Sequence, residues 1–208
     1  GYCLSTRPLE GAVLAAVGGV LLLGRIINIT PQRVRSALFY ASGLCLGIIP
    51  YLGYNLSTTG HSLHTGYTLT WGGNGFGFGP VNWGPTHTPW YGLLNSSMSL
   101  AGLNAYLWEI PIPALLGVFF WALLGGRLSR WDKAFLATLI LIPAGYWLYY
   151  FHDYMLGPRY YYCLVPQLIY FSLKGIRALL GRLEETTTIP VQILRRGFIL
   201  AGIMLLFL

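Results

Sequence analysis

The chain has 208 residues, of which 55% are hydrophobic and only 9% are charged. Water-soluble domains carry about 25% charged residues, so the composition excludes an ordinary soluble protein and predicts an all-α integral membrane protein. The net charge of +7 requires no nucleic-acid partner, because Lys and Arg gather on the cytoplasmic side of membrane proteins.

Apolar runs of about 20 residues, the length at which a helix crosses the hydrocarbon core of a bilayer, recur along the chain. They predict five complete transmembrane helices, at residues 9–29, 36–56, 110–126, 133–151 and 160–180, and part of a sixth that starts near Gly197. The chain begins with Gly1 rather than Met, and Leu208 falls inside the incomplete sixth run. We therefore expect residues 1–208 to be a single transmembrane domain, a fragment of a longer protein.

The positive residues alternate from loop to loop along this predicted topology. Eleven of the 13 Lys and Arg residues lie in or beside the links that follow the first, third and fifth spans, and only Arg7 and Arg159 lie on the other side. The positive-inside rule places the eleven in the cytoplasm. We therefore expect a multi-pass protein of the cell (inner) membrane, with the loop at residues 57–109 facing the periplasm or the cell exterior.

The loop at residues 57–109 contains no Lys or Arg and is long enough to indicate a function of its own. Its Gly-rich run, WGGNGFGFGP, fits neither a phosphate-binding loop nor a dinucleotide fingerprint. Its aromatic side chains, among them Trp83, are suited to sugar rings or to the lipid interface.

The second half of this loop, residues 90–108, predicts a helix with two different sides. The apolar side holds Trp90, Leu93, Leu94, Met98, Ala101 and Leu107, and the polar side holds Asn95, Ser96 and Ser99. Leu103 on the polar arc and Asn104 on the apolar arc depart from the pattern. We interpret the segment as an interfacial helix on the outer leaflet; the alternative is a helix buried against the spans.

Three histidines of the loop, His61, His64 and His87, are candidate metal ligands. Together with Asp153 or Glu109 they would supply the imidazoles and carboxylates that divalent metals prefer. Loop histidines that hydrogen-bond the backbone show the same pattern. We predict no metal and no other cofactor.

The two outer-side arginines, Arg7 and Arg159, each adjoin a proline, in TRPLE and GPRYYY. Proline fixes the local backbone and so helps to hold its neighbour in place. A guanidinium matches phosphate oxygens bidentately, and a cation at a membrane boundary needs a partner. The alternatives are ion pairs, Arg7 with Glu10 and Arg159 with Asp153, or contacts with lipid headgroups.

Five stretches of the chain, taken together, show a family pattern: STRPLEGAVLAAVGGVLLL, YNLSTTGHSLHTGYTL, GFGFGP, HTPWYGLLNSSMSLAGLNAYLWEIP and FHDYMLGPRYYYCLVPQL. They resemble successive stretches of bacterial multi-pass membrane glycosyltransferases of the GT-C superfamily, related to protein O-mannosyltransferases and lipid A aminoarabinose transferases. The most specific is PRYYYCLVP, which is similar to an Arg-Tyr pattern followed by Pro in many members. The resemblance implies an enzyme that transfers a sugar from a polyprenyl-phosphate donor to an acceptor on the outer side of the membrane.

The resemblance implies an acidic catalytic base in an outer loop upstream of Gly1, and Asp153 is a local candidate only. The remaining roles are assigned from the chemistry of the residues under this interpretation of the function. The donor phosphate would be held by Arg159, Arg7 and Tyr160. The acceptor or sugar cleft would be lined by His61, His64, His87, Trp83 and His152. A transporter or flippase of a lipid-linked glycan is the alternative function, and a structural subunit is a third.

Overall fold

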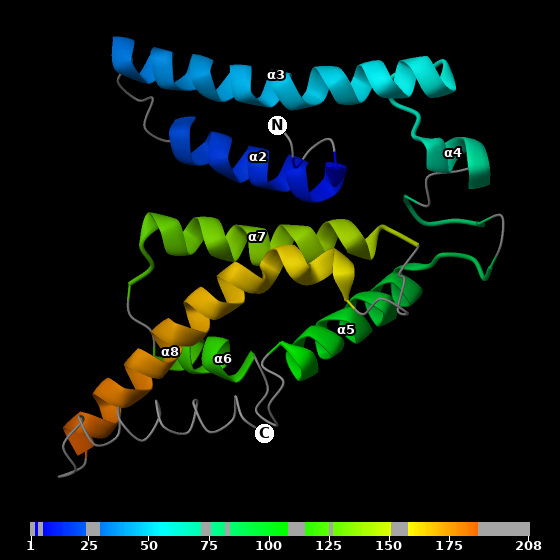
Figure 1. The fold of residues 1–208 in the computed structure, drawn as a ribbon. Coiled ribbons are helices and arrows are strands. Elements are labelled where there is room, and N and C mark those ends of the chain that lie inside the picture. Colours follow the sequence, from blue (N-terminus) through cyan, green and yellow to red (C-terminus); the bar gives the residue numbers. More distant parts are fainter. Residues whose placement is uncertain are drawn as a thin grey trace, which may run out of the picture. The chain divides into compact units, whose positions relative to one another are not determined.

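The computed structural model describes residues 3, 6–23, 30–71, 76–81, 84–107, 115–124, 127–150 and 158–186. Within these ranges the fold is all helical (Figure 1), which confirms the all-α part of the predicted class. The extended pairing in the same ranges consists of two isolated bridges, Phe76 with Tyr149 and Gly79 with His87. The predicted sixth span, from about Gly197, lies outside the described residues.

The chain divides into two compact units. One lies within Gly1–Met98 and Leu128–Met155, and the other within Ser99–Arg127 and Leu156–Leu208. Helix α5 (Pro89–Tyr106) contributes residues to both units. The single transmembrane domain expected from the sequence stays a prediction.

In the first unit, helix α2 (Pro8–Leu23) packs against α3 (Pro31–Thr59) and α7 (Arg130–Trp147). The Tyr40 hydroxyl of α3 donates a hydrogen bond to the backbone carbonyl of Ala15 in α2. At Gly145 of α7, a Cβ atom would lie 2.8 Å from Cδ1 of Leu9. The absence of a side chain at Gly145 therefore allows α2 and α7 to approach closely.

The limits of these helices follow from the local sequence. Helix α3 has Pro31 at its first position and is capped after Thr59 by Gly60, whose φ of 76° is left-handed and whose N–H donates to the Leu56 carbonyl. Proline fits a helix start and glycine fits this cap. Helix α7 begins with a capping box, in which the Ser129 hydroxyl accepts from the Asp132 N–H and the Asp132 carboxylate accepts from the Ser129 N–H. The short α4 (Gly66–Trp71) follows α3.

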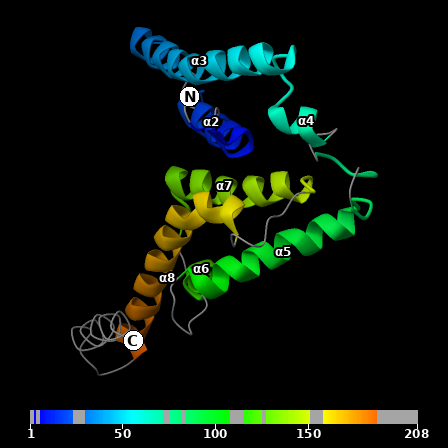
Figure 2. The same cartoon turned by 45° about the vertical axis from the view of Figure 1, so that its right-hand side comes forward.

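In the second unit, helix α6 (Leu115–Leu124) packs along α8 (Val165–Thr186), and the 3₁₀ helix η2 (Arg159–Leu164) leads directly into α8 (Figures 1 and 2). A Cβ atom at Gly175 would collide with the backbone carbonyl oxygen of Gly117. The Trp121 and Phe171 rings lie 4.1 Å apart between centroids. Two glycines and one aromatic pair thus define the α6–α8 contact.

Two segments of the described chain are long and apolar enough to cross a membrane, α3 with 29 residues and Arg159–Glu185 with 27 residues. They correspond to the spans predicted at residues 36–56 and 160–180. The predicted spans at residues 9–29 and 110–126 correspond to the shorter apolar helices α2 and α6. The span predicted at residues 133–151 corresponds to α7, which has 18 residues but does not reach the same apolar character. Five complete spans are not supported by the described helices.

Helix α5 confirms the helix predicted at residues 90–108. Its polar side is buried and its apolar side is exposed: Trp90 is 73% exposed, whereas Ser96 is only 6% exposed. Leu103, which departs from the pattern by lying on the polar arc, is buried with that arc. Asn104 on the other arc accepts a hydrogen bond from the Leu115 N–H at 2.8 Å.

Candidate functional site

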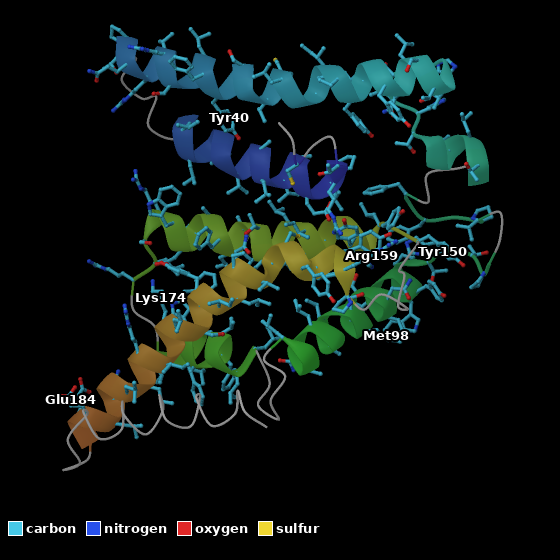
Figure 3. All side chains as sticks on the ribbon, viewed as in Figure 1. Tyr40, Met98, Tyr150, Arg159, Lys174 and Glu184 are labelled. Atoms are coloured by element: carbon cyan, nitrogen blue, oxygen red, sulfur yellow. The ribbon has the colours of Figure 1, made fainter. Side chains whose placement is uncertain are left out.

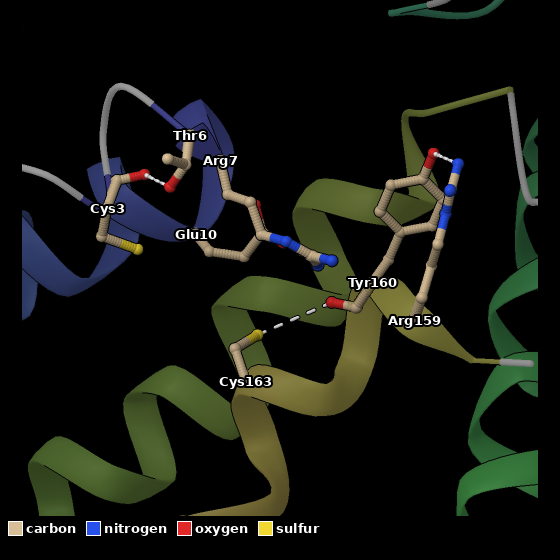
Figure 4. Close-up of polar contacts among 7 residues, drawn as sticks. All are labelled: Cys3, Thr6, Arg7, Glu10, Arg159, Tyr160 and Cys163. Carbon is tan, nitrogen blue, oxygen red and sulfur yellow. Dashed lines mark hydrogen bonds and ion pairs between the residues drawn. The ribbon is translucent and has the colours of Figure 1, made fainter. Parts of the chain in front are cut away.

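Arg159 is the first residue of η2, directly after Pro158. Its Nη2 donates to the Tyr160 hydroxyl at 3.0 Å, and its Cζ lies 4.9 Å from the centroid of the Tyr160 ring (Figure 4). The side chain is half-buried. The hydrogen bond and the cation–π contact together hold the guanidinium plane against Tyr160. The sequence-predicted pair Arg159 and Tyr160 is therefore brought together at the start of the apolar segment.

Arg7 immediately precedes α2, and its Nη1 lies 3.0 Å from Oε1 of Glu10 (Figure 4). Glu10 is 1% exposed, whereas the Arg7 side chain is 40% exposed. A buried carboxylate needs a positive partner or hydrogen-bond donors, and Arg7 supplies both here. The ion-pair alternative considered for Arg7 is thus the arrangement observed, and its role toward a phosphate stays a prediction.

Four of the sequence-predicted candidates lie outside the described residues: Asp153, His152, Trp83 and the possible metal ligand Glu109. The suggested pairing of Arg159 with Asp153 and the local candidate for a catalytic base therefore stay predictions.

His61 and His64 lie together in the turn that follows α3. Their ring centroids are 4.7 Å apart, and both residues are exposed. The Thr59 hydroxyl lies 2.8 Å from the His61 carbonyl oxygen and 3.2 Å from the His64 carbonyl oxygen, so it can donate to either. The local turn, held by Thr59, explains why these two rings meet.

His87 lies in a different environment, which we call the aromatic cluster: the side chains of Phe78, His87, Tyr91, Trp147 and Tyr150. His87 is 1% exposed. The centroid of its ring is 5.2 Å from that of Phe78, 6.2 Å from that of Tyr91 and 5.7 Å from that of Tyr150. Phe78 also packs edge-on against Trp147 at 5.4 Å. His87 is therefore surrounded by side chains from three parts of the chain: the loop that carries Phe78, helix α5, and the end of α7.

Backbone contacts hold the aromatic cluster together. The His87 N–H donates to the Gly79 carbonyl at 2.8 Å, and the Gly79 N–H donates back at 2.9 Å. The Trp147 Nε1–H donates to the Pro89 carbonyl at 2.7 Å. At Gly92, a Cβ atom would collide with the Trp147 carbonyl oxygen, so α5 can approach the end of α7 only with glycine at this position.

The described residues contain no group of three or more His, Cys, Asp or Glu side chains arranged to hold a metal ion. The exposed His61–His64 pair and the buried His87 are in separate local environments. The prediction that the protein needs no metal stays a prediction.

Sequence reasoning did not identify Tyr91, Trp147, Tyr150 or Ser96 as possible site residues. The available signal was the run GFGFGP, in which Gly77 and Gly79 adopt φ values of 96° and 145° and so shape the loop that carries Phe78. No family model, curated protein or solved structure matches this chain. The site must therefore be interpreted from its own chemistry.

Proposed function

We propose that this chain is the membrane part of a glycosyltransferase that takes a sugar from a polyprenyl-phosphate donor and delivers it to an acceptor on the outer side of the membrane. In this proposal the chain has five complete spans and part of a sixth, and residues 57–109 face the periplasm or the cell exterior. The resemblance of PRYYYCLVP to the GT-C pattern is one reason for the proposal. The arrangement of Arg159 is the observation that carries it.

Arg159 stands at the first position of a 27-residue apolar segment, with its guanidinium stacked on Tyr160 and hydrogen-bonded to the Tyr160 hydroxyl. A lipid-linked phosphate has the same two parts, an anionic head and an apolar tail. A fixed guanidinium recognises the head through charge-assisted hydrogen bonds, and Leu173 of the following helix, which is 57% exposed, suits the tail. We assign the donor phosphate to Arg159 and Tyr160, with Arg7 as a further candidate.

The chemistry asked of these residues is limited. The bond between the sugar C1 atom and the phosphate oxygen breaks, the phosphate departs with the electron pair, and the acceptor oxygen forms the new bond to C1 while its proton passes to a base. Arg159 would stabilise the negative charge that grows on the departing phosphate, and the fold would contribute placement.

Surface character supports a membrane setting. The described surface of α3 exposes many large apolar side chains, among them Leu38, Leu46 and Ile49. In α5 the polar side is buried and the apolar side, including Trp90 and Met98, is exposed. Met98 is labelled in Figure 3. Water would favour the opposite arrangement, whereas lipid favours the observed one.

The test replaces Arg159 in the full-length protein and measures transfer of radiolabelled sugar from a polyprenyl-phosphate donor in proteoliposomes. A hydrogen bond to a charged group contributes about 1.5–3 kcal/mol, so Arg159→Ala should reduce donor use by roughly ten- to a hundredfold. Arg159→Lys should recover only part, since it keeps the charge and loses the planar fork. The matched control is Arg182→Ala, which removes an exposed arginine of α8 that pairs with Glu185.

Near-normal transfer by a well-folded Arg159→Ala variant would refute the donor site. Movement of the lipid-linked sugar between leaflets without a new glycosidic bond would instead establish the alternative, a transporter or flippase. Binding of undecaprenyl phosphate, compared with that of neutral undecaprenol, measures recognition of the phosphate separately from sugar transfer, because the proposed arginine contact requires the phosphate.

A further inference from the structure

We propose that the aromatic cluster together with Ser96 of α5 forms a binding subsite for a neutral carbohydrate. Its polar contacts would be Nδ1 of His87 and Oγ of Ser96. Within the described part of the chain, both atoms are buried and have no hydrogen-bond partner. The two residues are 1% and 6% exposed. Buried polar atoms are nearly always paired, so such an atom needs an explanation, and an absent ligand is one.

The tautomer of His87 follows from its other nitrogen. Nε2 lies 3.3 Å from the Trp147 carbonyl oxygen, which can only accept, so Nε2 carries the hydrogen in this contact. In the neutral ring Nδ1 is then an acceptor. The group that complements it is a donor, such as a hydroxyl.

Ser96 and His87 are linked through Gly92. A Cβ atom at Gly92 would lie 3.2 Å from Cε1 of His87, so this side of α5 faces the imidazole. Ser96 is four residues further along α5, on the same side of the helix and about 6 Å along its axis. The two orphaned atoms therefore lie along one side of one helix.

The surroundings define the class of ligand. The subsite contains Phe78, Tyr91, Trp147 and Tyr150 besides its two polar residues, and it includes no Asp, Glu, Lys or Arg side chain. The Tyr91 and Tyr150 rings are stacked at 5.9 Å with an interplanar angle of 17°. A neutral ring that bears hydroxyl groups suits both the two polar atoms and the aromatic rings. Its hydroxyls can form hydrogen bonds with Nδ1 and Oγ, and its apolar C–H face can pack against the rings.

This inference rests on the proposed function only for the role of the ligand, which we take to be the sugar acceptor. Binding itself can be measured without a donor and without transfer. Loss of the Arg159 effect described above would refute the donor site and leave the binding result unchanged, so the two failures are distinguishable.

The experiment measures thermal unfolding of the full chain in a detergent that contains no sugar, such as a phosphocholine detergent. The probes are methyl α-D-mannopyranoside and methyl α-D-glucopyranoside at millimolar concentrations. Mannitol serves as the reference, because polyols raise stability generally by exclusion from the protein surface. We expect at least one glycoside to raise the melting temperature more than mannitol does, since a ligand that binds only the folded state stabilises it.

Three variants identify the site. Ser96→Ala and His87→Gln should abolish the glycoside-specific rise; Gln retains a donor for the Trp147 carbonyl but lacks the Nδ1 position. Ser97→Ala is the matched control on α5, because Ser97 is exposed and its hydroxyl donates to the Leu94 carbonyl at 2.9 Å. It should keep the full rise. Without glycoside, Ser96→Ala should melt no lower than the original protein, since the hydroxyl it removes has no partner in the fold.

Three results would overturn the proposal. The first is an absence of any glycoside-specific rise in the original protein, which would mean that water alone meets the two atoms. The second is a rise that persists in Ser96→Ala or in well-folded His87→Gln. The third is a melting temperature of ligand-free Ser96→Ala several degrees lower, which would mean that the hydroxyl is satisfied within the fold.

Discussion

The contact between α6 and α8 predicts opposite effects of alanine at two glycines of α8. Alanine should lower the free energy of unfolding at one of them and raise it at the other. At Gly175, an added Cβ atom would collide with the Gly117 carbonyl oxygen and lie 2.8 Å from the Trp121 amide nitrogen. That second distance is about 0.7 Å shorter than an ordinary contact of about 3.5 Å, and both obstacles are backbone atoms that cannot rotate away. Within the described chain, no atom lies within 4 Å of a Cβ atom at Gly181.

The magnitudes follow from these two environments. Overpacking costs about 1–3 kcal/mol, and the upper value applies at Gly175 because backbone must move. Alanine has a better helix propensity than glycine, which offsets about 1 kcal/mol of this cost. Gly175→Ala should therefore lower the free energy of unfolding by about 2 kcal/mol. Gly181→Ala should raise it by about 1 kcal/mol, since only the propensity changes.

The assay is equilibrium unfolding of the full chain by SDS in mixed micelles, followed by tryptophan fluorescence. Separation of α6 from α8 should also weaken the Trp121–Phe171 contact and change the emission of Trp121 in the folded Gly175→Ala variant. If Gly175→Ala proves as stable as Gly181→Ala, then α6 and α8 do not meet at Gly117, and the reasoning about this interface is wrong.

Two other predictions concern the orientation of the chain and the start of α7. In a protein whose native cysteines are replaced by serine, an impermeant thiol reagent applied to intact cells should label Asn74→Cys and spare Leu128→Cys; the reverse pattern would invert the predicted topology. Ser129→Ala should lower the free energy of unfolding by about 0.5–2 kcal/mol, because it removes the hydroxyl that caps α7, whereas Ser129→Asp should retain most of the stability. Equal stability of the alanine and aspartate variants in the same SDS titration would contradict the capping role.

Helix α5 illustrates what the sequence could and could not predict. Its period correctly grouped Asn95, Ser96 and Ser99 on one side, because a spacing of three or four residues places side chains on one face. The period cannot say which face is inside, since that depends on whether water or lipid surrounds the helix. Leu103 departs from an outward-facing polar arc, but it fits an arc that is buried.

The candidate site likewise contains one contact that the sequence could predict and one that it could not. His61 and His64 are three residues apart in one turn, so their proximity follows from local sequence. His87 and Trp147 are 60 residues apart, and nothing in the spacing along the chain indicates that they meet. Their contact depends on the close approach allowed at Gly92, a property of packing between two elements.

The capping box of α7 was readable in the sequence, because serine followed three residues later by an acidic side chain is a known helix start. The apolar run alone predicts that this helix starts later, at Lys133, because hydropathy takes no account of the polar residues in the first turn of a helix. Helix α7 starts at Arg130. Apolar runs locate helix interiors well and helix ends poorly.

The lengths of the two longest apolar segments have a consequence for depth. At about 1.5 Å per residue, the 29 residues of α3 extend for about 43 Å, and Arg159–Glu185 is of similar length, because its first turns are 3₁₀ helix with a longer rise. The hydrocarbon interior of a bilayer is about 30 Å thick, and the bilayer with its headgroups about 40–45 Å. A membrane that held both segments upright would therefore have their terminal turns, with Arg33 at one end of α3 and Arg159 at the start of η2, at the level of the lipid phosphates.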